Sequence, residues 1–200
     1  MYSKLIVITN RHLCQKEDLT KDYRADYFNQ IEKVVGLHPN ALILREKDLS
    51  TEEYRQYAQR VMKICARERV PFFIHSHVEV AKDLGCNAIH FSIPKLRENR
   101  NFLEYFHQIS VSCHSLEDAI EAQEAGATQI ILGNIFETDC KKGLPGKGLE
   151  FLAEVASHVD IPVYAIGGIN PDNLGVVMQY GAAGGCMMSG FMRMNTTTLV

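Results

Sequence analysis

Residues 109–132, ISVSCHSLEDAIEAQEAGATQIIL, contain the pattern that decides the fold. The first five and the last four of these residues are short apolar segments, which are typical of buried strands. Between them, Ser115 and Asp118 have the spacing of a helix capping box, and Gly126 supplies a residue at which such a helix ends. Two strands joined by one helix predict a right-handed unit within a parallel sheet.

The same alternation runs along the whole chain. Ser50 and Glu53 form a second capping box ahead of apolar residues at helical spacing. The pair Asn170-Pro171 predicts a helix that starts at the proline and ends at Gly181. The apolar segments predicted as strands are eight, namely residues 5–9, 41–44, 71–74, 88–91, 109–113, 129–132, 162–166 and 184–188.

Eight strand–helix units predict a closed (β/α)8 TIM barrel in which residues 1–200 form a single domain, near the ~200-residue lower limit for this fold. The alternative is an open doubly wound sheet, which is disfavoured because residues 9–12, after the first strand, contain no glycine. About a dozen residues follow the last strand, so the final helix should be short or missing. Either that end is frayed, or a partner subunit, as in a homodimer, covers the flank.

Composition and charge exclude several classes of partner. The net charge of the chain is −3 and no stretch of five or six like charges occurs, so neither nucleic acid nor an anionic membrane surface is expected to bind. No apolar run approaches the ~18 residues that a membrane span needs. Six cysteines are scattered without a C-x-x-C pair, which indicates free thiols in a reducing cytoplasm. The first residues lack the basic segment and cleavage site of a signal peptide, so a cytoplasmic location is expected.

The ends of the last two predicted strands carry glycine-rich turns. Gly167 and Gly168 follow the seventh strand, and Met188, Ser189 and Gly190 follow the eighth. Glycines let the backbone approach a ligand and helix N-termini present unpaired N–H groups, which is how barrels commonly bind phosphate at this position. The alternative is that these are ordinary turn glycines. Their occurrence after two neighbouring strands favours phosphate binding.

A connection of about fifteen residues, 133–148, follows the sixth predicted strand. A structureless loop of this length in a compact domain is usually functional. Its threonine, lysines and glycines suit an anionic ligand under a mobile flap, and the binding candidates are Thr138, Lys141 and Gly148. The alternative for the paired lysines is ordinary solvation at the surface.

Two cations stand at the end of the second predicted strand. Arg45 and Lys47 are candidates for ligand binding there. A cation that points into a barrel mouth needs a partner of opposite charge. That partner is either a ligand or a neighbouring carboxylate such as Glu46, and the residues alone leave both interpretations open.

Four histidines fall at or near strand ends: His75, His77, His90 and His114. A metal site is disfavoured because no carboxylate accompanies them with ligand-like spacing. His114 differs from the others because it directly precedes the helix cap Ser115. The positive end of a helix disfavours the imidazolium form, and a neutral ring suits a general base. The alternative is a packed histidine without a catalytic role.

These motifs together resemble the thiamine phosphate synthase/TenI superfamily along essentially the whole chain. The matching strings are LREKD at residues 44–48, SCHSLEDA at residues 112–119, IGGINP at residues 166–171 and MSG at residues 188–190. The most specific string is IFETDCKKG at residues 135–143, which is similar nearly letter for letter to the loop of TenI-type thiazole tautomerases.

The resemblance implies one of two activities. The synthases join a pyrimidine diphosphate to a thiazole phosphate using Mg²⁺. Their pattern has a glutamine two residues before the arginine of the second strand, Asn-Asp-Arg after the third strand and Gln-x-Asp after the fourth. Here the corresponding residues are Ile43, His-Ser-His at 75–77 and Ile-Pro-Lys at 93–95. Both carboxylates expected on Mg²⁺ are absent, and histidine and lysine do not replace them on a hard cation, so the synthase is disfavoured.

The resemblance to the tautomerases therefore sets the expected function. It implies an isomerase of thiamine biosynthesis that converts a non-aromatic carboxythiazole phosphate into its aromatic tautomer, with His114 moving the proton. The expected substrate is a phosphorylated thiazole, and neither a metal nor an organic cofactor is expected. Cys113, His75 and His77 depart from the usual family residues. A thiamine phosphate synthase and a non-catalytic regulator that binds thiazole phosphate remain as alternatives.

Overall fold

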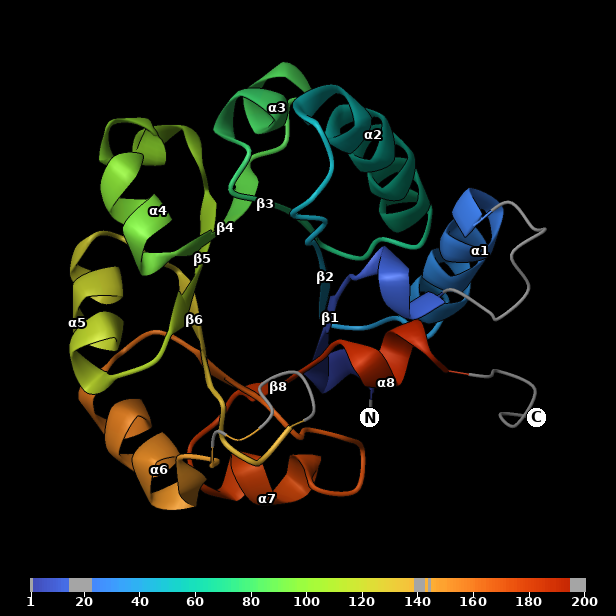
Figure 1. Ribbon diagram of the computed structural model, residues 1–200. Coiled ribbons are helices and arrows are strands. Elements are labelled where there is room, and N and C mark those ends of the chain that lie inside the picture. The colour runs from blue at the N-terminus through green and yellow to red at the C-terminus, as the bar shows by residue number, and fades with distance from the viewer. Residues whose placement is uncertain (1, 15–22, 139–142, 144, 195–200) are drawn as a thin grey trace.

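The computed structural model describes residues 2–14, 23–138, 143 and 145–194. Eight parallel strands close into a barrel in the order β1-β2-β3-β4-β5-β6-β7-β8. Closure is made by β1 and β8, in which Ile6 pairs with Cys186. The helices surround this ring (Figure 1). The prediction of a (β/α)8 barrel is confirmed, and the open doubly wound sheet is excluded.

Each strand lies within one residue of its predicted range. Short apolar runs are sufficient signals here because strands of a closed barrel are covered on both faces. The strands are β1 Leu5–Ile8, β2 Ala41–Leu44, β3 Phe72–His75, β4 Ala88–Ser92, β5 Gln108–Cys113, β6 Gln129–Gly133, β7 Val163–Ile166 and β8 Gly184–Met187. Their apolar side chains form the centre of one buried cluster that continues into the helices.

The α-helices of the described residues alternate with the strands. They are α1 Tyr23–Val35, α2 Thr51–Arg67, α3 Val78–Asp83, α4 Ile93–Glu98, α5 Leu116–Glu124, α6 Gly148–His158, α7 Leu174–Gln179 and α8 Ser189–Met192. Short 3-10 helices are η1 Tyr2–Lys4, η2 Arg11–Cys14 and η3 Arg100–Tyr105. The last helix of the described residues, α8, has four residues, which confirms the prediction of a short final helix. The Gln30 side chain of α1 donates to Phe191 O of α8 at 2.6 Å and so ties this helix to the barrel.

The predicted helix starts are confirmed in part. Ser50 and Glu53 form a complete capping box at α2. At α5 the Ser115 hydroxyl accepts from Asp118 N at 3.1 Å, but the Asp118 carboxylate accepts from His114 N at 2.7 Å instead of completing the box. Asp118 thus fixes the backbone of the residue that precedes the cap.

The predicted start of the seventh helix is wrong. Helix α7 begins at Leu174, and Pro171 lies in a turn before it. The Asn170 side chain accepts from Asp172 N at 2.9 Å and from Asn173 N at 3.1 Å. An asparagine that bonds the backbone two residues ahead makes a turn instead of a helix cap. The turn extends the connection that follows β7.

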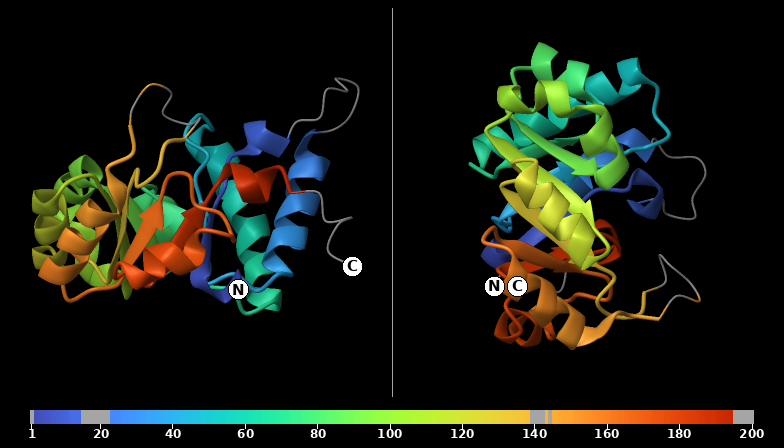
Figure 2. Two further views of the ribbon diagram at one scale, coloured as in Figure 1. Left: turned by 90° about the horizontal axis from the view of Figure 1, so that it is seen from below. Right: turned by 90° about the vertical axis from the view of Figure 1, so that its left-hand side faces the viewer.

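The side of the barrel where the strands end carries the connections that matter for function. In the left view of Figure 2, η2 and the segment that leaves β6 lie on the same upper side, opposite the start of β1. We refer to this side as the mouth. Within the described residues, no helix is both long and apolar enough to cross a membrane. The cysteines of this part of the chain, Cys14, Cys65, Cys86, Cys113 and Cys186, are free thiols.

Candidate active site at the mouth of the barrel

The glycine turn after β7 is packed against the segment that leaves β6. Gly167 and Gly168 have φ values of +97° and +66°, in the left-handed region that favours glycine. A Cβ on Gly167 would lie 2.5 Å from Asn134 Cβ, and one on Gly168 would lie 2.7 Å from Phe136 Cβ. Close packing therefore requires both glycines, as the alternative of turn glycines implies. The N–H of Gly168 has no acceptor among the described residues.

The turn after β8 adds further backbone donors beside that N–H. Ser189 is the first residue of α8, with Met188 as its cap and Gly190 next in the chain. N–H groups in the first turn of a helix have no acceptor within the helix. Because β7 and β8 are paired neighbours, these donors and Gly168 lie at adjacent strand ends. Such a group of backbone donors is suited to a phosphate.

The connection after β6 contributes less than its length suggested. Gly148 begins α6 with φ +87°, but its N–H donates to Ile135 O at 3.0 Å and is not free for a ligand. Thr138 is half-buried at the described edge of this connection. Lys141 lies outside the described residues. The Lys147 ammonium donates to His114 O and stands 4.8 Å from the centre of the Phe151 ring.

Arg45 and Lys47 are the cations of the mouth that lack a carboxylate partner within the described residues. Glu46, between them in the sequence, is 2% exposed and turned elsewhere. Its carboxylate accepts from Thr9 Oγ1 at 2.7 Å and from Arg11 N at 3.0 Å. The alternative of an Arg45–Glu46 ion pair is therefore excluded, and ligand binding by the two cations stays a prediction.

The two cations act on histidines of the neighbouring strands. Burial, followed by Arg45 and Lys47, lowers the pKa of His75 at the end of β3 to about 3. Burial also holds the pKa of His90 in β4 well below its usual value, with His75, Arg45 and Lys47 adding to the effect. The pKa of Lys47 is lowered by partial desolvation and by Arg45. Both imidazoles are therefore neutral at pH 7 beside two positive charges.

A hydrogen-bonded set inside the barrel was missed by sequence reasoning. His90 is 3% exposed, with Nδ1 2.9 Å from Ser110 Oγ and Nε2 2.8 Å from Ser112 Oγ. The His75 and His90 ring centroids are 5.5 Å apart. A signal was available, because Ser110 and Ser112 occupy alternate positions of β5 and therefore face the same side. Polar residues at that period mark a hydrophilic part of the barrel interior.

His114 is exposed and has one ring nitrogen committed. Its Nδ1 lies 2.7 Å from Gly133 O, and because a carbonyl only accepts, Nδ1 carries the proton. Nε2 has no hydrogen-bond partner among the described residues. This geometry permits the predicted role in proton transfer and does not by itself require it.

The four candidate histidines form no metal centre. Among residues 2–14, 23–138, 143 and 145–194, no group of three or more His, Cys, Asp or Glu side chains could hold a metal ion. The two carboxylate positions of the synthase pattern correspond here to Ser76, which lies between β3 and α3 and is flanked by His75 and His77, and to Lys95 in the first turn of α4. Lys95 Nζ pairs with Glu98 at 2.5 Å. Imidazole and ammonium groups do not fit a cation that requires oxygen ligands.

Comparison with known proteins agrees with this barrel and identifies its family. The family model described as thiamine monophosphate synthase matches residues 5–191. The chain belongs to that family. A thiamine-phosphate synthase of Clostridium acetobutylicum is 31% identical over 94% of this chain and 87% of the relative. A thiamine-phosphate synthase of Clostridium botulinum is 32% identical over 94% of this chain and 90% of that relative. The structure titled thiamine phosphate pyrophosphorylase from Pyrococcus furiosus superposes with TM-score 0.80 and 27% identity, over 97% of this chain and 89% of that one.

The family comparison corrects the expected function. The resemblance to the superfamily is confirmed, but the prediction of a thiazole tautomerase, an isomerase, is wrong. The curated relatives are named thiamine-phosphate synthase, which is a transferase, and the structure neighbour has a transferase title as well. The loop string that favoured the tautomerase lies in part outside the described residues, so no geometry supports it there.

Proposed function

We propose that the chain is a transferase that joins a pyrimidine, carried as its diphosphate, to a phosphorylated thiazole. The observation that supports the proposal is that two different groups of residues suited to anions lie at one mouth. One consists of backbone donors at the ends of β7 and β8, and the other consists of Arg45 and Lys47 beyond β2. Strand β1 separates β8 from β2, so the two groups are distinct.

Two such groups match the charge of two substrates. A single phosphate occupies one cradle of backbone N–H groups, whereas a coupling reaction also has to hold a diphosphate. In the proposed reaction, the bond from the pyrimidine's methylene carbon to its diphosphate breaks as a bond to the thiazole forms, and pyrophosphate leaves. Fixed positive charge near the leaving group stabilises the charge that develops there. Arg45 and Lys47 are suited to that task because no described carboxylate neutralises them.

The relatives' names support the same assignment. The residues of the mouth that match the superfamily strings, Arg45, Lys47, Gly167, Gly168 and Ser189, all lie at strand ends around one opening. A displacement of pyrophosphate removes no proton from carbon. The proposal therefore gives His114 no proton to carry.

The experiment is a coupling assay with the purified chain, the pyrimidine diphosphate and the thiazole phosphate. We expect stoichiometric thiamine phosphate and pyrophosphate, measured by chromatography and by a phosphate-release assay. The Arg45→Gln variant should lose at least about tenfold in kcat/KM, since a charge-assisted contact contributes on the order of 1.5–3 kcal/mol. Arg97→Gln, on the outer surface of α4, is the matched control. Absence of product with and without Mg²⁺ would refute the transferase.

A second candidate is a non-catalytic protein that binds thiazole phosphate. The observation that favours it is the lack of a carboxylate set for Mg²⁺ among the described residues. Such a protein would bind thiazole phosphate in equilibrium dialysis, and Gly168→Val would weaken that binding. It would produce no thiamine phosphate under any metal condition, so the same assay separates the two candidates.

A further inference from the structure

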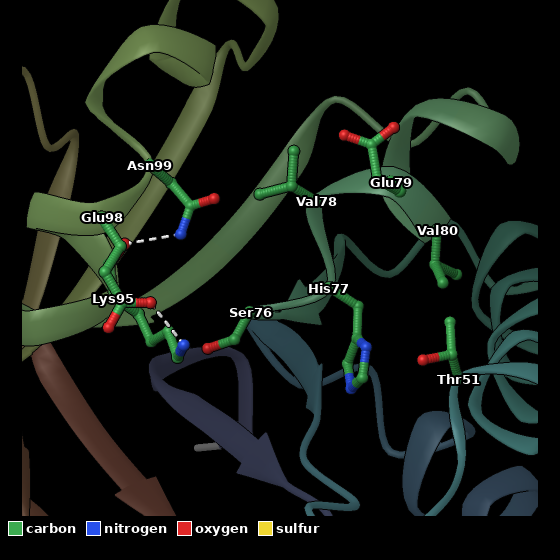
Figure 3. A pocket seen from close by; sticks show the side chains of 9 residues that line it. All are labelled: Thr51, Ser76, His77, Val78, Glu79, Val80, Lys95, Glu98 and Asn99. Carbon is green, nitrogen blue, oxygen red and sulfur yellow. Dashed lines mark hydrogen bonds and ion pairs between the residues drawn. The ribbon is translucent and has the colours of Figure 1, made fainter.

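A polar pocket opens between the segments that follow β3 and β4. Its volume is about 380 Å³, and its lining includes Ser76, His77, Lys95 and Glu98 (Figure 3). The His77 ring forms a fixed wall, because it stacks on Tyr54 with ring centroids 4.0 Å apart. The pocket thus lies on the mouth side of two strands whose ends carry no phosphate cradle.

Ser76 has an unusual backbone and an unsatisfied side chain. Its φ is +63°, in the left-handed region that a serine rarely occupies. Its Oγ is inaccessible to solvent and has no hydrogen-bond partner. Strained backbone and orphaned polar atoms cluster where a ligand supplies what the protein lacks. Figure 3 shows this hydroxyl and the Lys95 side chain pointing toward each other.

Lys95 is held by an interaction that is easily exchanged. Its ammonium pairs with Glu98 on the same helix, and the two side chains are 49% and 56% exposed. Exposed pairs of this kind contribute little to stability. An anion with a higher charge than one carboxylate can therefore draw Lys95 away from Glu98 and over Ser76.

The carboxylates around this region each have a hydrogen-bond or ion-pair partner. Glu46 accepts from Thr9 and from the backbone of Arg11, and Asp48 pairs with the Arg11 side chain at 2.6 Å. Glu79, in the pocket wall, lies 3.7 Å from the Lys82 ammonium. Among the described residues, the carboxylates that line this pocket are Glu79 and Glu98, each paired with a lysine of its own helix, and no group of three or more side chains could hold a metal ion. An anion would find the Lys95 ammonium there.

We propose that this mouth binds the diphosphate of the second substrate without a divalent cation, with Lys95 and the Ser76 hydroxyl supplying contacts that complement Arg45 and Lys47. The inference rests on the proposed coupling function, and it names how this chain holds the leaving group. When the diphosphate binds, one of its phosphoryl oxygens replaces the Glu98 carboxylate as the partner of the Lys95 ammonium. The diphosphate also accepts a hydrogen bond from the Ser76 hydroxyl.

The test measures binding of inorganic pyrophosphate by isothermal titration calorimetry, which does not depend on turnover. We expect the wild-type Kd in excess EDTA to be equal to or lower than the Kd in millimolar Mg²⁺. Lys95→Gln should raise the Kd by about tenfold to a hundredfold in EDTA, in line with the loss of a charge-assisted contact. Arg97 lies on the same helix and, among the described residues, forms its ion pair with Glu121. The control variant Arg97→Gln should therefore bind pyrophosphate as the wild type does.

A reversed charge sharpens the test. Lys95→Asp should bind pyrophosphate at least tenfold more weakly in EDTA and should recover part of the loss when Mg²⁺ is added. Ser76→Ala keeps the charges and should raise the Kd severalfold. Thermal unfolding of each variant shows whether the barrel is intact.

Three results would overturn the inference. They are a wild-type Kd at least tenfold higher in EDTA than in Mg²⁺, no binding in either condition, or equal Kd values for wild type and folded Lys95→Gln. If any of these results is found together with coupling activity, the proposed transferase function is supported and only the metal-free binding site is refuted. Conversely, metal-free pyrophosphate binding without coupling supports the site and refutes the transferase.

Discussion

Replacing one glycine of the turn after β7 should destabilise the barrel, and replacing another farther along the same connection should not. The change is Gly168→Ala, with Gly175→Ala as its control. A methyl group on Gly168 would lie 2.7 Å from Phe136 Cβ and 2.8 Å from Glu137 O, at a φ of +66°. A methyl group on Gly175 would have no heavy atom within 4 Å, in a residue of helix α7.

The expected magnitudes follow from these surroundings. A side chain in the left-handed region costs about 1–2 kcal/mol, and overpacking against a neighbour costs about 1–3 kcal/mol. Gly168→Ala should therefore lower the free energy of unfolding by about 2–5 kcal/mol. For a chain of this size, each kcal/mol shifts Tm by roughly 2–4 °C, so a fall of about 4–20 °C is expected. Gly175→Ala should raise stability by up to ~1 kcal/mol, because alanine is the better helix former.

The assay is thermal unfolding of both variants and the wild type in the same buffer, followed by binding of thiazole phosphate. If the segment after β6 does not yield to the new methyl group, residue 168 itself has to shift, its N–H moves and thiazole phosphate binds more weakly. Equal Tm values for the two variants would refute the packing argument. Unchanged ligand binding by a destabilised Gly168→Ala would instead remove this N–H from the phosphate site.

Three further outcomes are expected. Glu46→Ala should lower the free energy of unfolding by about 2–4 kcal/mol in urea titrations, because buried donors of Thr9 and Arg11 lose their acceptor. His90→Leu should keep the fold but raise the KM for the pyrimidine diphosphate more than it changes kcat, since Ser112, whose hydroxyl lies 2.8 Å from His90 Nε2, is near the mouth end of β5. The pKa of His75 is lowered to about 3, so the unfolded chain binds its proton first and stability should fall by up to ~1.4 kcal/mol per pH unit below pH 6.5. His75→Gln should flatten that slope between pH 6.5 and 4.5; an unchanged slope contradicts the assignment.

The strands could be predicted closely because their signal is physical and local. Each is a run of apolar residues that must be buried, bounded by caps and turns. The start of α7 could not be predicted in the same way, because an asparagine before a proline serves both as a cap and as the first residue of a turn. Whether Asn170 bonds a helix or a turn depends on the space that the segment after β6 leaves above β7.

The sequence alone left open whether Arg45 pairs with a ligand or with a neighbouring carboxylate such as Glu46. Both Arg45 and Glu46 lie just beyond β2, where the alternation of side chains along a strand no longer decides which way each one points. What could not be read from the chain is the destination of that carboxylate. Arg11 is 35 residues away in sequence, and only closure of β1 against β2 brings its backbone N–H to Glu46.

The prediction of a tautomerase instead of a transferase was wrong for a different reason. The transferase was disfavoured because histidine and lysine stand where carboxylates would hold Mg²⁺, and that argument treats the metal as indispensable. Its role, however, is to place positive charge beside a diphosphate, and positive charge has other sources. Arg45 and Lys47 have no described carboxylate partner, and Lys95 is held only by an exposed one. A ligand set missing from the described residues therefore argues against a metal held by the protein alone, but it excludes a reaction only where no other cation reaches the same phosphoryl oxygens.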